Sequence, residues 1–383
     1  RFLSFYAETL SFGFVDFTTP PSGRNFIIPC MNYVVIDQDP DADSDEISDQ
    51  LEFIAGTNPE DPDSDNDGFL DGAEIKQGQD PLDGFVQTTG IIASGPTPGP
   101  AIDICAVNNI LMVACGESGV AILNARPGDA PTRIAQVNTP GNASAVTCFG
   151  NLVGVVDGDA GLAVVDISDP PAAHIRHQVR TPSPATSITA RGNFAFVGLQ
   201  NGRIVMVDMV TGIQISEFRG IRSPIMDLGE RNGFIYALVQ GRLHTISINE
   251  GDFNLEHSLN ITAGIGAGGN RPRLFVGDDF LYPIDLSGYS AVDISDPTTP
   301  TLVEYFRTQQ RGWKQIQADG SGFGVAAVSP NSTRDGPHHI DLYRVGDDNR
   351  ESVYTATFET PGIARAIALY NGYAYIADDT RGI

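Results

Sequence analysis

Cationic side chains are scarce in this sequence of 383 residues. Lys and Arg number 23 against 48 Asp and Glu, which gives a net charge of −25 at pH 7. No basic patch is visible, and this argues against a nucleic-acid partner. No apolar run reaches the roughly 18 residues needed to cross a bilayer, so we expect no membrane insertion in this segment. A nucleophile elbow, a phosphate loop and a His-Glu zinc pattern are also missing, so no catalytic residue is predicted.

Cysteine is rare as well. The chain has four cysteines, Cys30, Cys105, Cys115 and Cys148, and their spacing does not match a metal site. An even count is compatible with disulfides in an oxidising compartment. The apolar strand contexts of the last three are equally compatible with buried free thiols. The sequence therefore leaves the disulfide state open.

The acidic residues are concentrated in residues 37–83, where one pattern occurs twice at a spacing of 22 residues. This segment contains 17 Asp and Glu but a single Lys. The copy at residues 39–52 reads Asp-Pro-Asp-Ala-Asp-Ser-Asp-Glu-Ile-Ser-Asp-Gln-Leu-Glu, and the copy at residues 61–74 reads Asp-Pro-Asp-Ser-Asp-Asn-Asp-Gly-Phe-Leu-Asp-Gly-Ala-Glu. Without cations these carboxylates would repel one another, so the repeated pattern predicts metal binding rather than a solvated linker.

Each copy spaces its oxygen donors as an EF-hand loop does, because a calcium ion requires six to eight oxygens at about 2.3–2.6 Å. Gly68 supplies the sharp turn in the second copy, whereas the first copy has Glu46 there, so we expect a weaker or differently shaped first site. The predicted ligands are Asp41, Asp43, Asp45, the Ile47 carbonyl, Asp49 and Glu52 in the first loop, and Asp63, Asp65, Asp67, the Phe69 carbonyl, Asp71 and Glu74 in the second. We expect two or more structural Ca²⁺ ions.

The Asp-Pro-Asp-x-Asp-x-Asp core of both copies resembles thrombospondin type 3 repeats, which occur in many bacterial cell-surface proteins. The resemblance covers residues 37–83. It implies a segment that wraps calcium ions with almost no hydrophobic core and that joins or spaces other domains. Weak sites of this kind fill at the millimolar calcium found outside cells, so we expect an extracellular, cell-surface or periplasmic protein.

A second repeat, of about forty residues, begins near residue 97. The phrase Thr-Pro-x-x-Ala starts at Thr97, Thr139, Thr181 and Thr360. Each phrase is followed by two apolar runs separated by a turn of Asn, Gly or Asp, and seven such hairpins can be counted. A third and a fourth apolar run follow in most units. This pattern predicts an all-β protein, a seven-bladed β-propeller with an N-terminal connector of calcium-binding loops.

The third strand carries the most specific part of this repeat. Residues 161–170 read Gly-Leu-Ala-Val-Val-Asp-Ile-Ser-Asp-Pro, and residues 289–297 read Tyr-Ser-Ala-Val-Asp-Ile-Ser-Asp-Pro. These sequences resemble the LVIVD repeat of secreted and surface bacterial proteins. The resemblance is best for residues 144–185, and it extends to residues 269–312 and 363–383. It implies a propeller fold and little about activity.

Three regions follow from these patterns. Residues 1–36 are expected to form a short β segment or the remnant of a preceding domain, residues 37–83 the calcium-binding repeats, and residues 84–383 the propeller. Residues 84–93 precede the first Thr-Pro phrase, where an outer strand belongs, and residues 364–383 provide only two inner strands. We therefore expect the outer strand to close the ring, the last blade to be incomplete and the native chain to continue past Ile383.

The leading functional hypothesis is a non-enzymatic scaffold outside the cell or on its surface, stabilised by calcium and adhering to a protein or polysaccharide. One alternative is a secreted hydrolase or lyase with its site at the mouth of the propeller channel. Another is a self-assembling subunit of an extracellular filament or surface layer. Ligand identity and oligomeric state are left open by the sequence.

Several aspartates are candidates for a polar site at that channel mouth. They follow inner strands or lie in an inner hairpin turn, and they are Asp157, Asp159, Asp278, Asp279, Asp378 and Asp379. Aspartate is also a common turn residue, and turn chemistry repeated by duplication accounts for the same positions more simply.

Overall fold

We describe a computed structural model of the protein. It describes residues 2–6, 11–15, 40–43, 45, 47–64, 70–72, 75, 81–82, 91–125, 130–249, 251–261, 272–277, 279–285, 288–307, 311–318, 323–329, 338–345, 352–370 and 373–383. The chain divides into two compact units, Arg1–Thr89 and Gly90–Ile383.

The first unit contains a β-hairpin and a short helix. β1 (Phe2–Tyr6) pairs antiparallel with β2 (Ser11–Val15). α1 (Asp49–Ala55) has two acidic residues in its first turn, where the helix dipole favours negative charge, and its C-cap is Gly56 at φ 94°. Its apolar side packs in a small cluster of Ile47, Leu51 and Ile75. Across the described ranges, no helix has the length and apolar character that crossing a membrane would require.

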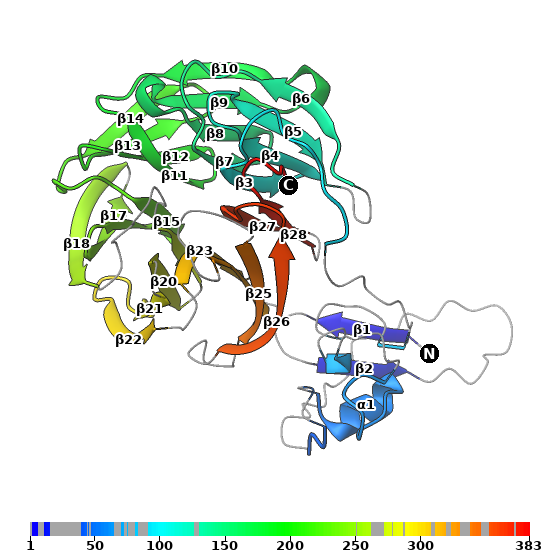
Figure 1. Cartoon of the computed structure of the whole chain (residues 1–383). Helices are drawn as coiled ribbons and strands as arrows, with labels where there is room; N and C mark the ends of the chain where they lie inside the picture. Colours follow the sequence, from blue (N-terminus) through cyan, green and yellow to red (C-terminus); the bar gives the residue numbers. More distant parts are fainter. Residues whose placement is uncertain are drawn as a thin grey trace, which may run out of the picture. The chain divides into compact units, whose positions relative to one another are not determined.

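The second unit is an all-β propeller of four-stranded antiparallel sheets, or blades, arranged around a common centre (Figure 1). Blade 1 comprises β3 (Asp103–Val107), β4 (Ile110–Ala114), β5 (Val120–Asn124) and β6 (Arg133–Val137). Blade 2 comprises β7 (Ala145–Phe149), β8 (Leu152–Val156), β9 (Leu162–Asp166) and β10 (His174–Val179). Blade 3 comprises β11 (Ala185–Arg191), β12 (Phe194–Leu199), β13 (Ile204–Asp208) and β14 (Ile213–Phe218).

The remaining blades follow in chain order. Blade 4 comprises β15 (Asp227–Arg231), β16 (Phe234–Val239), β17 (Arg242–Asn249) and β18 (Asp252–Asn260). Blade 5 comprises β19 (Leu274–Val276), β20 (Phe280–Asp285), β21 (Gly288–Asp293) and β22 (Thr301–Arg307). Blade 6 comprises β23 (Arg311–Ala318), β24 (Phe323–Ser329), β25 (His338–Val345) and β26 (Ser352–Thr360). Two short 3₁₀ turns, η1 (Gly158–Ala160) and η2 (Pro170–Ala172), connect strands in blade 2.

The predicted count of seven blades is wrong, because the described residues form six four-stranded blades. The seventh predicted hairpin forms a sheet of two strands, β27 (Ala366–Tyr370) and β28 (Tyr373–Ala377). The all-β class and the propeller architecture are confirmed. Repetition alone predicted the number of hairpins, but whether a third and a fourth strand join each hairpin depends on which segments pair with it.

The blades are held together by apolar clusters that lie between them. Met112 and Ile122 of blade 1 share one buried cluster with Val153 and Val165 of blade 2. Each sheet is covered on both faces only by stacking on its neighbours, which explains the continuous apolar runs in the second strands. The inner hairpin turns have the positive φ expected of them, for example 50° and 59° at Asn108 and Asn109.

The ring closes between the two-stranded sheet and blade 1. The first strands of successive blades contact each other in turn, and β27 contacts both β23 and β3. An antiparallel bridge joins Ala101 to Asp379, and an equivalent bridge joins Gly116 to Ala143 between blades 1 and 2. In addition, the Gly95 amide donates to the Ile383 carbonyl at 2.8 Å, and the Ile383 amide donates to the Gly95 carbonyl at 3.0 Å.

Candidate functional site

The two acidic repeats fold with the same local hydrogen bonds, which supports their common ancestry by duplication. The Asp49 amide donates to the Pro40 carbonyl at 2.9 Å, and the Asp71 amide donates to the Pro62 carbonyl at 2.9 Å. Likewise, the Asp49 carboxylate accepts the Ala42 amide at 2.9 Å. The Asp71 carboxylate accepts the amide two residues after Pro62, that of Ser64, at 3.0 Å. Each loop is therefore closed by the aspartate that lies eight residues after its first predicted ligand, Asp49 after Asp41 and Asp71 after Asp63.

Carboxylates from the two repeats meet in one buried group. Asp45, Glu52 and Asp71 each offer an oxygen that lies within 4.8 Å of the other two, and all three side chains are buried. The first comes from a loop, the second from α1 and the third from the second repeat. The Gly72 amide donates to Asp45 Oδ2 at 2.9 Å. A side chain at Gly72 would collide with the Asp45 backbone, so glycine is required for this close approach.

A second group lies within the first repeat. Asp41, Asp43 and Asp45 also place one oxygen each within 4.8 Å of the others, with exposure falling from Asp41 to Asp45. Their alternation along the chain puts three carboxylates on one side of a turning loop, as the spacing predicts. Asp45 belongs to both groups and thus connects them.

Burial makes these carboxylates hard to ionise without a cation. Desolvation, together with the charges of Asp43 and Asp45, raises the pKa of Glu52 to about 7. Desolvation also raises the pKa of Asp45 to about 6, although amide hydrogen bonds from Ile47 and Gly72 oppose this effect. Among the described residues, neither carboxylate oxygen of Glu52 has a hydrogen-bond partner. Buried acceptors of this kind normally have one, so Glu52 is suited to a metal ligand.

The oxygens fit the requirements of calcium. Two ligands on one ion can be at most about 5.2 Å apart when each lies within about 2.6 Å of it. The 4.8 Å limit on both groups satisfies this condition. Hard carboxylate oxygens are the donors that calcium prefers, and a divalent cation would offset both the burial and the repulsion that raise the pKa of Glu52.

The predicted ligands thus have four different outcomes. Asp41, Asp43, Asp45, Glu52 and Asp71 fall into the two groups, whereas Asp49 closes its loop by accepting an amide. Asp63 is described but its carboxylate belongs to neither group, and the prediction for the Ile47 carbonyl stays a prediction, because the groups contain side-chain oxygens only. The others, Asp65, Asp67, Phe69 and Glu74, lie outside the described residues. Sequence reasoning treated the two loops as separate sites and missed the shared group. It also missed α1, which the acidic first turn and the following Gly56 could have indicated.

At the centre of the propeller, Arg273 crosses between blades that are not neighbours. It immediately precedes β19 of blade 5, and its Nη2 donates to Asp103 Oδ1 of blade 1 at 2.8 Å. Its Nε lies 3.6 Å from Asp227 Oδ2 of blade 4. Burial disfavours the charge of Arg273, but the two carboxylates outweigh this and raise its pKa. The same carboxylates accept backbone amides of the next blades, those of Val146 and Leu274.

The aspartates considered for a channel-mouth site serve mainly in turns. Asp157 Oδ2 accepts the Gly141 amide at 3.0 Å, and Asp378 Oδ2 accepts the Gly362 amide at 2.8 Å. Asp379, at φ 52°, forms an ion pair of 2.6 Å with Arg365. The exposed Asp159 and Asp279 join no metal-like group in the described ranges, and Asp278 lies outside them. Asp157 and Asp378 thus make the same contact with the glycine of a Thr-Pro phrase, which agrees with a structural role repeated by duplication.

The cysteines, whose state the sequence left open, also connect blades. Cys105 of β3 and Cys148 of β7 form a disulfide across a sequence separation of 43 residues, with Cα atoms 6.1 Å apart. Cys115 is free and buried, and burial raises the pKa of its thiol to about 11. Cys30 lies outside the described residues.

Comparison with known families confirms both repeat assignments. The LVIVD repeat matches residues 140–181, 183–210, 268–308 and 361–383, and the bacterial TSP3 repeat matches residues 63–84. The chain contains LVIVD repeats and a bacterial TSP3 repeat. The TSP3 match covers the acidic copy that has Gly68 at the turn, whereas the LVIVD matches include blade 2 and the two-stranded sheet. No curated protein matches the chain.

Solved structures share the fold of this chain at low sequence identity. The computationally designed Ika8 protein aligns with a TM-score of 0.53 and 11% identity, over 75% of this chain and 97% of its own. The WD40 repeats of RRP9 align with a TM-score of 0.55 and 8% identity, over 71% and 84% of the two chains. At these identities the similarity shows the propeller fold alone.

Proposed function

We propose that this protein is a non-enzymatic scaffold of the cell surface or extracellular space, and that calcium orders its acidic segment. The observation that carries the calcium part is the buried group of Asp45, Glu52 and Asp71, which brings three carboxylates within 4.8 Å. Binding of a divalent cation there would couple metal affinity to the folding of residues 37–83. The ion would be structural, because α1 and both repeats contribute to one group.

The scaffold part of the proposal is supported by contacts that stiffen the propeller. Arg273 links blades 5, 1 and 4 at the centre, and the Cys105–Cys148 disulfide links blades 1 and 2. A disulfide also favours an oxidising compartment, in agreement with a secreted, surface or periplasmic location. A rigid ring of this kind presents its loops and outer strands to a protein or polysaccharide partner.

Calcium titration of the purified chain tests the first part. Glu52→Gln should weaken calcium binding at least about tenfold in isothermal titration calorimetry, since a buried ligand charge is lost. Glu60→Gln is the matched control, because it makes the same chemical change at an exposed residue outside both groups. Limited proteolysis should cut residues 37–83 faster in chelator than in calcium, while the propeller stays intact. Equal cleavage under both conditions would contradict the proposal.

Binding and turnover assays test the second part. Immobilised protein, with calcium present, should retain a cell-surface protein or polysaccharide from extracts without altering it chemically. The enzyme alternative would be established instead if the purified chain hydrolysed or eliminated a glycan or ester and one substitution at the propeller face abolished that activity.

A further inference from the structure

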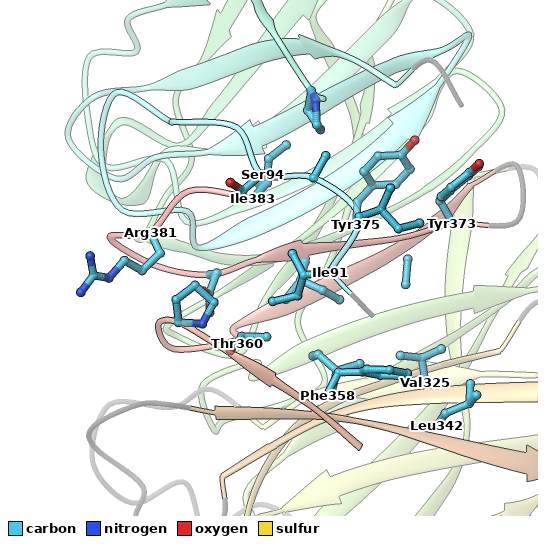
Figure 2. A pocket seen from close by; sticks show the side chains of 18 residues that line it. Ile91, Ser94, Val325, Leu342, Phe358, Thr360, Tyr373, Tyr375, Arg381 and Ile383 are labelled. Atoms are coloured by element: carbon cyan, nitrogen blue, oxygen red, sulfur yellow. The ribbon is translucent and has the colours of Figure 1, made fainter. Parts of the chain in front are cut away.

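Two cavities of the propeller have comparable volumes. One, of about 340 Å³, lies beside β28, and its lining is mainly apolar, with Phe358, Val325 and Leu342 grouped on the blade 6 side (Figure 2). The other, of about 400 Å³, is lined by residues of blades 3 and 4. It is bounded by two complete four-stranded sheets, so its shape does not depend on the two-stranded sheet. Its volume is within the range of small-molecule sites, about 300–1,000 Å³.

The floor of the cavity between blades 3 and 4 is aromatic and closely packed. Phe194 and Phe196 are alternate residues of β12, so both side chains point toward blade 4. Phe196 is 1% exposed, and its ring packs edge-on against that of Phe253 in blade 4, with the ring centroids 6.2 Å apart. Met206 of β13 and Ile248 of β17 complete the apolar lining. A floor that is already ordered loses little conformational entropy when a ligand binds to it.

The rim of this cavity is polar, and its charges are balanced. The turn after β11 contributes Arg191, Asn193 and Phe194, all of them exposed. Arg191 Nε lies 3.6 Å from Glu230 Oε1 at the end of β15, and the Arg191 side chain remains 55% exposed. Glu230 is held in place by the Gly233 amide, which donates to its Oε1 at 2.9 Å. The rim therefore combines hydrogen-bonding groups with an aromatic ring that is 40% exposed.

The corresponding turns at two other junctions are joined by hydrogen bonds. Between blades 1 and 2, the Asn108 side chain donates to the Gly150 carbonyl at 3.2 Å. Between the two-stranded sheet and blade 1, the Tyr370 hydroxyl accepts the Asn109 amide at 2.8 Å. Between blades 3 and 4, the contact is the longer ion pair of Arg191, and the cavity opens beside it.

These properties favour a neutral ring that carries hydroxyl groups. An anionic ligand is disfavoured, because Glu230 already balances the charge of Arg191 and the chain has a net charge of −25. A cationic ligand would be repelled by the guanidinium. A purely apolar group would remove water from Arg191 and Asn193 without replacing its hydrogen bonds. A sugar ring replaces those bonds with its hydroxyls, and its C–H face packs on the electron-rich face of an aromatic ring.

We propose that the cavity between blades 3 and 4 binds one pyranose ring of a neutral polysaccharide. The C–H face of the sugar would lie on the exposed part of the Phe194 ring, and its hydroxyls would bond to the Arg191 guanidinium and the Asn193 carboxamide. This site rests on the scaffold function proposed above, for which polysaccharides are one class of partner, and it identifies where on the propeller they bind.

Saturation-transfer NMR of the full chain with soluble sugars tests the site. The panel contains neutral trisaccharides of glucose, galactose, mannose and N-acetylglucosamine, and at least one should bind, with saturation strongest at the ring protons of one unit. Phe194→Ala should weaken this binding at least about tenfold, because it removes the aromatic face. Phe149→Ala is the matched control: Phe149 is 45% exposed at the corresponding turn of blade 2 and lies outside the lining, so binding should stay unchanged.

A second pair of variants tests the polar rim. Arg191→Met should weaken trisaccharide binding at least about tenfold, because the sugar hydroxyls lose a charged donor. Arg176→Met removes an exposed, paired arginine from blade 2 and should leave binding unchanged. Thermal unfolding confirms that all four variants are folded.

Several outcomes would overturn the sugar site. They are failure of every trisaccharide in the panel to bind, equal weakening by Phe194→Ala and Phe149→Ala, and tighter binding of phenylacetate or benzyl alcohol than of any trisaccharide. If the site fails in this way while the protein still retains a surface polymer, the scaffold function stands. Cleavage of a trisaccharide bound in this cavity would instead refute the non-enzymatic scaffold and leave the site standing.

Discussion

Replacing Arg273 by methionine tests whether the central ion pairs hold the propeller together. The side chain is 15% exposed, and those of Asp103 and Asp227 are 5% and 8% exposed. Methionine has a similar length but no charge, so Arg273→Met leaves two carboxylates in a place with little access to water. The expected result is a loss of propeller stability rather than of any single local contact.

The magnitude follows from the burial of the three groups. Removing one partner from a buried ion pair costs about 3–5 kcal/mol, because the remaining charge is uncompensated. The residual exposure of Arg273 places the expected loss near the lower end, at about 3 kcal/mol. Arg176→Met is the matched control: Arg176 pairs with Asp166 at 2.9 Å but is 40% exposed, and such surface pairs contribute about 1 kcal/mol or less.

Urea denaturation of the full chain, followed by the fluorescence of Trp313, measures both changes. A further variant combines Arg273→Met with Asp103→Asn and Asp227→Asn, whose side-chain oxygens can still accept the Val146 and Leu274 amides. It should recover most of the stability, because no buried charge remains. If Arg273→Met costs no more than Arg176→Met, or if the two asparagines bring no recovery, the role assigned to the ion pairs is wrong.

Three further predictions concern the blades. Cys105→Ser combined with Cys148→Ser should lower the free energy of unfolding by up to about 4 kcal/mol, because the disulfide restricts the entropy of the unfolded chain over a separation of 43 residues. An unchanged free energy of unfolding would contradict a stabilising disulfide. Burial raises the pKa of Asp157 above 3.8, so ionisation destabilises the fold as the pH rises through the folded-state value. Asp157→Asn should therefore stabilise the protein near about pH 7 and have no effect near about pH 3, and the opposite pH dependence in thermal unfolding would refute this. Phe196 is 1% exposed, and Phe196→Ala should lower the free energy of unfolding in urea by about 3–5 kcal/mol. Phe194 is 40% exposed, and Phe194→Ala should lower it by only about 0.5 kcal/mol. Similar losses for the two variants would exclude close packing around Phe196.

Periodic sequence features predicted the propeller because they report local geometry. The turn at Asn108 and Asn109 requires positive φ, and the structure has it. The apolar run of β8 implies a strand covered on both faces, and all five of its residues are buried. The blade count could not be predicted in the same way, because β27 and β28 have the inner-strand pattern whether or not further strands pair with them.

In the acidic segment, too, the sequence predicted the contacts within one repeat but not those between the two repeats. The alternation of Asp41, Asp43 and Asp45 indicated a shared metal-like group within one loop, and the structure places these residues together. Nothing in the linear spacing indicated that Asp71 of the second repeat would join Asp45 and Glu52 of the first. That contact depends on how the two repeats pack, including the close approach at Gly72.

The sequence by itself determined the repeat periods, the strand and turn positions and the concentration of acidic oxygens in one segment. These properties depend on neighbouring residues, whose backbone preferences and alternation are set locally. Only the tertiary structure decided that Arg273 meets Asp103 across 170 positions of the chain and that Cys105 pairs with Cys148 rather than with Cys115. It alone placed a cavity between blades 3 and 4. Contacts of this kind arise when separate segments close a ring, and the geometry of that closure is encoded by the packing of all blades rather than by any one of them.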